Sequence, residues 1–97
     1  MAMFSEIYCV LKGKVQRVGL RDFVEGYARA QGLFGWIKNK PDGSVELVVQ
    51  GTPDQLKECT LVLNQGTPLT CVESLSVDWR TPEKQFDEFR VISSYEK

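Results

Sequence analysis

The sequence predicts an α+β fold in which a mainly antiparallel sheet of four or five strands carries two helices on one face. Three observations support this prediction. The apolar pattern follows the order strand, helix, strand, strand, helix, strand, with a small extra strand at the end. Two helices are too few to cover both faces of such a sheet. Finally, 97 residues fit one small domain and leave no room for a second, so we expect a single domain over residues 1–97.

The first half of the chain predicts a strand, a loop, a helix and a hairpin. Apolar residues alternate along residues 4–13, and a short loop with a glycine at each end follows, Gly13 to Gly19. Apolar residues then recur at helical spacing, and Gly32 is placed to end that helix: Leu20, Phe23, Val24, Tyr27, Ala28. Residues 33–39 and 45–50 read as strands joined by a proline- and glycine-containing turn, which predicts a hairpin.

The second half predicts a capped helix and two more strands. Thr52 followed by Pro53 and Gln55 matches a capping box with proline at the first helical position. Residues 71–80 read as a strand with a bulge between Val72 and Leu75, because the alternation breaks there. Phe86, Phe89 and Val91 suggest a short closing strand. This element order corresponds to a ferredoxin-like βαββαβ plait.

Composition excludes several classes of function. Twelve basic and thirteen acidic residues nearly balance, which argues against non-specific binding of nucleic acid. The absence of histidine excludes Ser-His-Asp and Cys-His catalysis and the commonest zinc sites. Three widely spaced cysteines form no metal or disulfide pattern, and we expect them to be small buried residues. No signal peptide or transmembrane run is visible, so we predict a cytoplasmic protein without membrane partners. The small, charge-balanced surface leads us to expect a monomer.

One segment has a local excess of positive charge. Lys12, Lys14, Arg17 and Arg21 lie within ten residues and no acidic residue interrupts them. The loop between them leads into a predicted helix, whose first N–H groups are free to bind an anion such as phosphate. The spacing does not match the nucleotide-binding P-loop, because Leu20 and Arg21 stand where that motif requires lysine and a hydroxyl residue. From these residues alone, a phosphate site and a solvated basic loop both stay open.

The motifs themselves are more specific. The segment Gly13-Lys-Val-Gln-Arg-Val-Gly-Leu-Arg21 is followed by Gly35-Trp-Ile-Lys-Asn39 and by a turn and strand, Pro41-Asp-Gly-Ser-Val-Glu46. This arrangement resembles the acylphosphatase family, whose motifs read roughly G-x-V-Q-G-V-x-F-R and G-[FYW]-[AVCI]-x-N. The resemblance extends over essentially the whole chain.

The resemblance implies roles for individual residues. Arg21 matches the phosphate-binding arginine, and Asn39 matches the asparagine that orients the attacking water. The phosphate-binding loop comprises Val15, Gln16, Arg17, Val18, Gly19 and Leu20, whose backbone N–H groups hold the remaining phosphate oxygens. The implied reaction hydrolyses a small-molecule acyl phosphate without a metal ion or organic cofactor. Phosphate or sulfate is expected to compete as an anion.

Two residues depart from the family pattern. Arg17 stands where the family usually has glycine, and Leu20 stands where it has an aromatic residue. If the backbone at position 17 needs a positive φ, a residue other than glycine is strained there. The alternative function is therefore a weakly active or non-catalytic phosphate-binding module on the same fold.

Further alternatives concern the roles of single residues and of the whole chain. Asn39 precedes a turn and is open to a purely structural role, and Arg21 has the spacing to pair with Glu25. An RNA-binding plait is disfavoured because the strand over residues 44–50 lacks stacking aromatic residues. A domain of a larger carbamoyl-transfer protein is conceivable, but the chain length leads us to expect a stand-alone protein.

Overall fold

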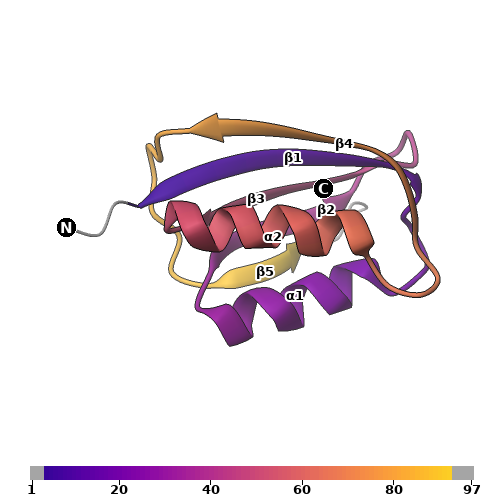
Figure 1. Ribbon diagram of the computed structural model, residues 1–97, viewed down its shortest axis with the longest axis horizontal. Coiled ribbons are helices and arrows are strands. Elements are labelled where there is room, and N and C mark those ends of the chain that lie inside the picture. Colours follow the sequence, from indigo (N-terminus) through magenta and orange to yellow (C-terminus); the bar gives the residue numbers. More distant parts are fainter. Residues whose placement is uncertain (1–3, 93–97) are drawn as a thin grey trace.

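The computed structural model describes residues 4–92. Along these residues the elements are β1 (Ser5–Lys14), α1 (Leu20–Gln31), β2 (Phe34–Asn39), β3 (Val45–Gly51), α2 (Pro53–Gln65), β4 (Cys71–Arg80) and β5 (Phe89–Ile92), as Figure 1 shows. The predicted order of strands and helices is confirmed. Each observed boundary lies within a few residues of the predicted one, which is the usual scatter at element ends.

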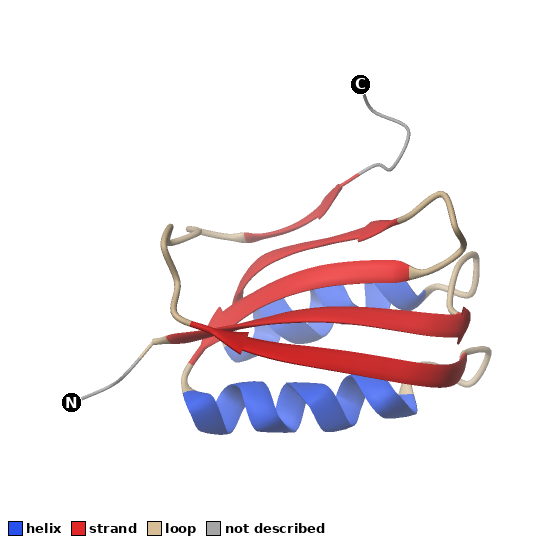
Figure 2. Cartoon of the chain, turned by 90° about the horizontal axis from the view of Figure 1, so that it is seen from above, coloured by secondary structure: helices blue, strands red, loops and turns tan. Residues whose placement is uncertain are grey.

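The strands form one sheet in the order β4-β1-β3-β2-β5. β1 is antiparallel to β3 and β4, β2 is antiparallel to β3, and only β5 runs parallel to its neighbour β2. Both helices lie on one face of the sheet (Figure 2), α1 over β2 and β5 and α2 over β1, β3 and β4. The predicted ferredoxin-like plait is therefore confirmed, and within residues 4–92 no helix covers the other face of the sheet.

Strand direction brings the predicted site residues to one end of the sheet. Because β1 and β2 are both antiparallel to β3, their carboxyl ends lie at the same end of the sheet. Lys14 ends β1, Asn39 ends β2, and α1 begins a few residues after Lys14. The first turn of α1 and the end of β2 thus become neighbours, although they are far apart in the sequence.

The core lies between the sheet and the helices. Alternate residues of β1 and β3 point to the helices and are fully buried: Ile7, Cys9, Leu11, Val45, Leu47, Val49. The helices cover them with residues at a spacing of three and four: Leu20, Val24, Ala28, Leu56, Cys59, Leu63. This spacing gives each helix one apolar face, which packs against the buried face of the sheet.

Two local predictions of structure are confirmed. The side chain of Thr52 accepts a hydrogen bond from the Gln55 amide, and the Gln55 side chain accepts one from the Thr52 amide, so α2 begins with a complete capping box. In the β1–β4 pairing, Lys12 faces Ser74 while Gly13 faces Val72. The one residue left over on β4 forms the predicted irregularity.

Two expectations are wrong. Phe86 does not belong to the closing strand, because β5 starts at Phe89 and the Phe86 amide instead donates to the Gln50 side-chain oxygen at 3.0 Å. Cys71 is exposed on an edge strand, whereas Cys9 and Cys59 are buried as expected, and burial raises the pKa of both thiols to about 12. β4 lies at the edge of the sheet and has a neighbouring strand on one side only. Sequence periodicity does not reveal which strand lies at the edge.

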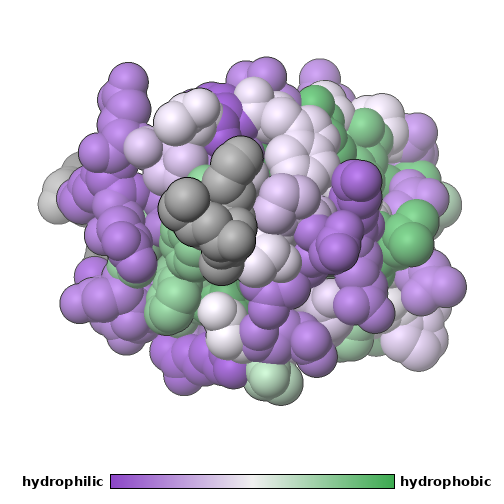
Figure 3. Space-filling view, turned by 60° about the vertical axis from the view of Figure 1, so that its left-hand side comes forward, coloured by the Kyte–Doolittle hydropathy of each residue, from purple (hydrophilic) through white to green (hydrophobic). Residues whose placement is uncertain are grey.

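Between residues 4 and 92, the large apolar side chains that are exposed do not come from a single element. They belong to separate segments of the chain: Phe4, Phe23, Leu61, Leu69, Trp79. Figure 3 shows one side of the molecule, where hydrophobic residues form separate groups among hydrophilic ones. Between residues 4 and 92, neither helix is long and apolar enough to span a bilayer.

Candidate active site at the start of helix α1

The first turn of α1 has no side-chain cap. Its N-cap residue is Gly19, which adopts a left-handed conformation with φ 77° and has no side chain that could accept a hydrogen bond from the helix. This differs from α2, where Thr52 and Gln55 satisfy the first amides. The free N–H groups and the positive end of the helix dipole leave α1 open to an anion.

The loop before α1 is built to expose its backbone. Val15, Val18 and Leu20 are at most 7% exposed and anchor the loop in the core. Between them, Arg17 and Gly19 have left-handed backbones with φ 62° and 77°. Turns of this kind direct successive N–H groups toward one point, which is the geometry of an anion-binding nest. Position 17 therefore has the positive φ at which a residue other than glycine is strained.

Two side chains fasten this loop to neighbouring segments. The Gln16 amide nitrogen donates to the carbonyl oxygens of Lys40 and Ser44, each at 2.8 Å. From the other side, the Thr67 hydroxyl donates to the carbonyl oxygen of Val18 at 3.2 Å. The first contact joins the loop to the β2–β3 turn and so fixes its position relative to the end of β2. The sequence offered no signal for Thr67 beyond its place after a helix.

A small cavity lies where these segments meet. Its volume is about 150 Å³, and its lining residues are Val15, Arg17, Gly19, Leu20, Arg21, Asp22 and Asn39. Pockets for whole small molecules usually measure roughly 300–1,000 Å³. The cavity therefore suits the head group of a substrate, with the remainder outside. Larger hollows lie elsewhere, around Trp36 and Phe86 on the helix-free face of the sheet.

Asn39 has a feature that its structural role in the turn does not explain. Its side-chain oxygen is buried and accepts no hydrogen bond within the described residues. The turn itself is closed by other groups, since the Lys40 amide donates to the Ser44 carbonyl and the Ser44 amide and hydroxyl donate to Asp42. A buried acceptor without a partner costs about 1–3 kcal/mol, so such groups call for a functional explanation.

Arg21 does not form an ion pair with Glu25, the acidic residue one helical turn further along α1. The Glu25 carboxylate binds Arg29 at 3.1 Å, one helical turn further on. Within residues 4–92, Arg21 forms no salt bridge. Its guanidinium keeps its full capacity for a bidentate contact with an anion.

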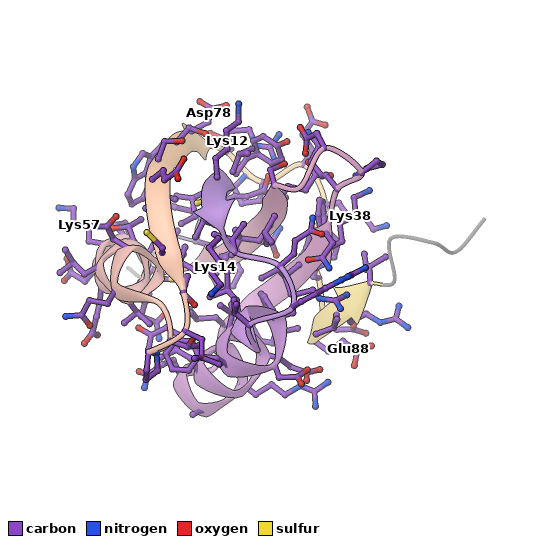
Figure 4. All side chains as sticks on the ribbon, turned by 90° about the vertical axis from the view of Figure 1, so that its right-hand side faces the viewer. Lys12, Lys14, Lys38, Lys57, Asp78 and Glu88 are labelled. Carbon is purple, nitrogen blue, oxygen red and sulfur yellow. The ribbon has the colours of Figure 1, made fainter. Side chains whose placement is uncertain are left out.

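The structure thus brings most of the predicted site residues together. Arg21, Asn39 and four residues of the loop line one cavity. Gln16 and Val18 do not line it, because the Gln16 side chain is turned to the β2–β3 turn and Val18 is buried. Figure 4 looks onto this end of the sheet, with Lys14 beside the loop and Lys12 and Lys38 further out.

Comparison with known proteins identifies the family. The family model described as acylphosphatase matches residues 7–91. The chain belongs to the acylphosphatase family. An acylphosphatase of Bordetella parapertussis is 39% identical over 88 residues, which cover 91% of this chain and 94% of that protein. An acylphosphatase of Thermococcus kodakarensis is 39% identical over 80 residues, covering 82% of this chain and 87% of that one.

Solved structures agree with this assignment. The crystal structure of acylphosphatase from Bacillus subtilis superposes with a TM-score of 0.87 and 30% identity, covering 91% of this chain and 98% of that one. Full-length HypF in its phosphate- and nucleotide-bound form has a TM-score of 0.84 at 19% identity, and this chain matches 12% of it. The second likeness shows the fold alone. The expectation that the chain is an acylphosphatase enzyme is confirmed by the family match and the B. subtilis structure.

Proposed function

We propose that this protein hydrolyses the carboxyl–phosphate anhydride bond of acyl phosphates, releasing a carboxylate and inorganic phosphate, without a metal ion. The observation that carries this proposal is the meeting of Arg21, Asn39 and the loop over residues 15–20 around one cavity at an uncapped helix start. Family membership supports the class of reaction. The roles of the residues rest on their geometry.

The phosphoryl group binds in the cavity. Backbone N–H groups of the loop and of the first turn of α1 donate to its oxygens, and Arg21 adds a planar guanidinium that contacts two of them. These donors are fixed before the substrate arrives, because Gln16 and Thr67 hold the loop. Fixed donors stabilise the charge that accumulates on the equatorial oxygens in the transition state.

Asn39 positions the nucleophile. Its unpartnered side-chain oxygen accepts a hydrogen bond from a water, and this bond aims the water at phosphorus in line with the leaving carboxylate. The water oxygen forms a bond to phosphorus, the bond from phosphorus to the acyl oxygen breaks, and the carboxylate leaves. Since the chain has no histidine, the proton acceptors at hand are a phosphate oxygen of the substrate and the Asp22 carboxylate, which also lines the cavity. We assign the proton of the water to the phosphate oxygen. The carboxylate is a good leaving group and needs no acid.

The test is steady-state hydrolysis of benzoyl phosphate in the presence of a chelator. Wild type is expected to turn over, while Arg21→Ala and Asn39→Ala lose about 100-fold or more in kcat/KM. Phosphate should still inhibit through the site in Asn39→Ala and bind weakly in Arg21→Ala. Exposed residues outside the cavity provide matched controls, Arg90→Ala and Asn64→Ala, which should resemble wild type. Loss of turnover on chelation, or full activity of both site variants, would refute the proposal.

A second candidate function is a phosphate-binding module with low turnover. The strained backbone of Arg17 favours it, because relief of the strain at φ 62° would move the loop N–H groups away from the phosphoryl oxygens. Under this alternative, wild type binds phosphate but hydrolyses benzoyl phosphate poorly, and Arg17→Gly gains turnover. The cytoplasmic location, the monomeric state and the lack of nucleic-acid partners stay predictions from the sequence.

A further inference from the structure

Arg17 has a backbone conformation that its side chain makes unfavourable. Among residues 4–92 it is the only residue other than glycine with a positive φ. A glycine at this position would present the same N–H group to an anion without strain. The backbone cradle therefore does not need the arginine side chain. Because strained residues concentrate at functional sites, the Arg17 side chain is a candidate for a function of its own.

The surroundings of Arg17 leave its charge available. The residue is exposed, lines the cavity, and forms no salt bridge with any residue between 4 and 92. One acidic residue, Asp22, also lines the cavity, and it balances only one of the two arginines there. Binding of the phosphoryl group is already provided by Arg21 and the loop amides, so Arg17 is a second cationic group at the same opening.

The same end of the sheet carries additional positive charge. Lys12 and Lys14 lie on the last residues of β1, and Lys40 follows β2. Hydrogen bonds from Ser44 lower the pKa of the Asp42 carboxyl, and Lys40 and Lys12 lower it further. In a chain with a net charge of −1, this end therefore attracts anions.

We propose that Arg17 determines substrate specificity by binding a second anionic group on the acyl side of the substrate. The cavity of about 150 Å³ takes the phosphoryl group, and the acyl part extends outward past the exposed Arg17. The substrate class is then acyl phosphates whose acyl group bears its own negative charge, such as a carboxylate. This inference rests on the proposed function.

The test compares three rigid substrates that differ only at the para position. These are benzoyl phosphate, 4-carboxybenzoyl phosphate and its uncharged counterpart 4-carbamoylbenzoyl phosphate. The quantity measured is the ratio of kcat/KM for the carboxy substrate to that for the carbamoyl substrate, which cancels differences in size. We expect wild type and Arg17→Lys to favour the carboxy substrate about threefold to fivefold, as exposed charge pairs allow. Arg17→Gln should bring the ratio close to one.

A matched control separates direct contact from the general field. Lys14→Gln removes a neighbouring positive charge that does not line the cavity, so its ratio should stay close to that of wild type. Equal loss in Arg17→Gln and Lys14→Gln would overturn the proposal, because the field alone would then explain the preference. Equal ratios in wild type and Arg17→Gln would overturn it while leaving hydrolysis intact. If none of the substrates is hydrolysed, the proposed function fails, and this inference with it.

Discussion

Replacing Arg17 by glycine should make the protein more stable. At φ 62° the side chain of a residue other than glycine clashes with its own backbone, at a cost of roughly 1–2 kcal/mol. Glycine removes this strain but gives the unfolded chain more freedom, which costs about 0.4–1 kcal/mol. The Arg17 side chain is exposed and forms no salt bridge within residues 4–92, so little else is lost. The expected net gain is about 0.5–1 kcal/mol.

Urea unfolding is the suitable assay. Trp36 and Trp79 lie on different strands of the sheet and report its unfolding by fluorescence. In a parallel thermal melt of a chain of this size, a gain of that magnitude should raise Tm by about 2–8 °C. The m-value should not change, because both variants expose the same surface on unfolding.

Two control variants test the reasoning. Arg17→Ala keeps the strained backbone, so its free energy of unfolding should lie within about 0.5 kcal/mol of wild type. Gly19→Ala does the reverse, since it introduces a side chain at φ 77°, and it should destabilise the protein by about 1 kcal/mol or more. If Arg17→Gly proves no more stable than Arg17→Ala, the backbone at position 17 carries no strain and the argument is wrong.

Three further predictions follow from the site and the thiols. Asn39→Ala should have the same or a slightly higher free energy of unfolding while losing activity, because it removes a buried oxygen without a partner. A clear loss of stability by calorimetry would contradict this. Gln16→Leu should destabilise by roughly 1–2 kcal/mol and raise KM, since it breaks two hydrogen bonds that hold the loop; unaltered kinetics would show that the contacts are dispensable. At neutral pH a thiol reagent should label Cys71 rapidly and leave Cys9 and Cys59 intact until unfolding, which mass spectrometry of peptides would reveal.

Much of the fold is readable from local patterns. The helical spacing over residues 20–28 and the alternation along residues 45–50 identify elements that the structure then contains. The capping box at Thr52 and the broken alternation after Val72 are equally local signals, and both correspond to observed features. These predictions succeed because they depend only on a few neighbouring residues and on backbone geometry.

The sequence also identified the residues of the candidate site, through two motifs at a characteristic spacing. It did not determine which of them would meet. Arg21 and Asn39 line one cavity because β1 and β2 are both antiparallel to β3, and that pairing is a property of the whole sheet. Likewise, the spacing of Glu25 permits a pair with Arg21 as well as with Arg29, and only the packed helix decides for Arg29.

Tertiary structure alone decided the contacts that hold the site. Gln16 reaches the β2–β3 turn and Thr67 reaches the loop before α1, over separations of 24 to 49 residues that no local pattern encodes. The exposure of Cys71 depends in the same way on β4 being an edge strand. Sequence periodicity records which face of an element is apolar, whereas the partners of a polar side chain depend on how the elements are arranged in space. The amino-acid sequence by itself thus determines the helices, the strands and the motifs. The arrangement of these elements in space brings the motif residues together and forms the candidate site.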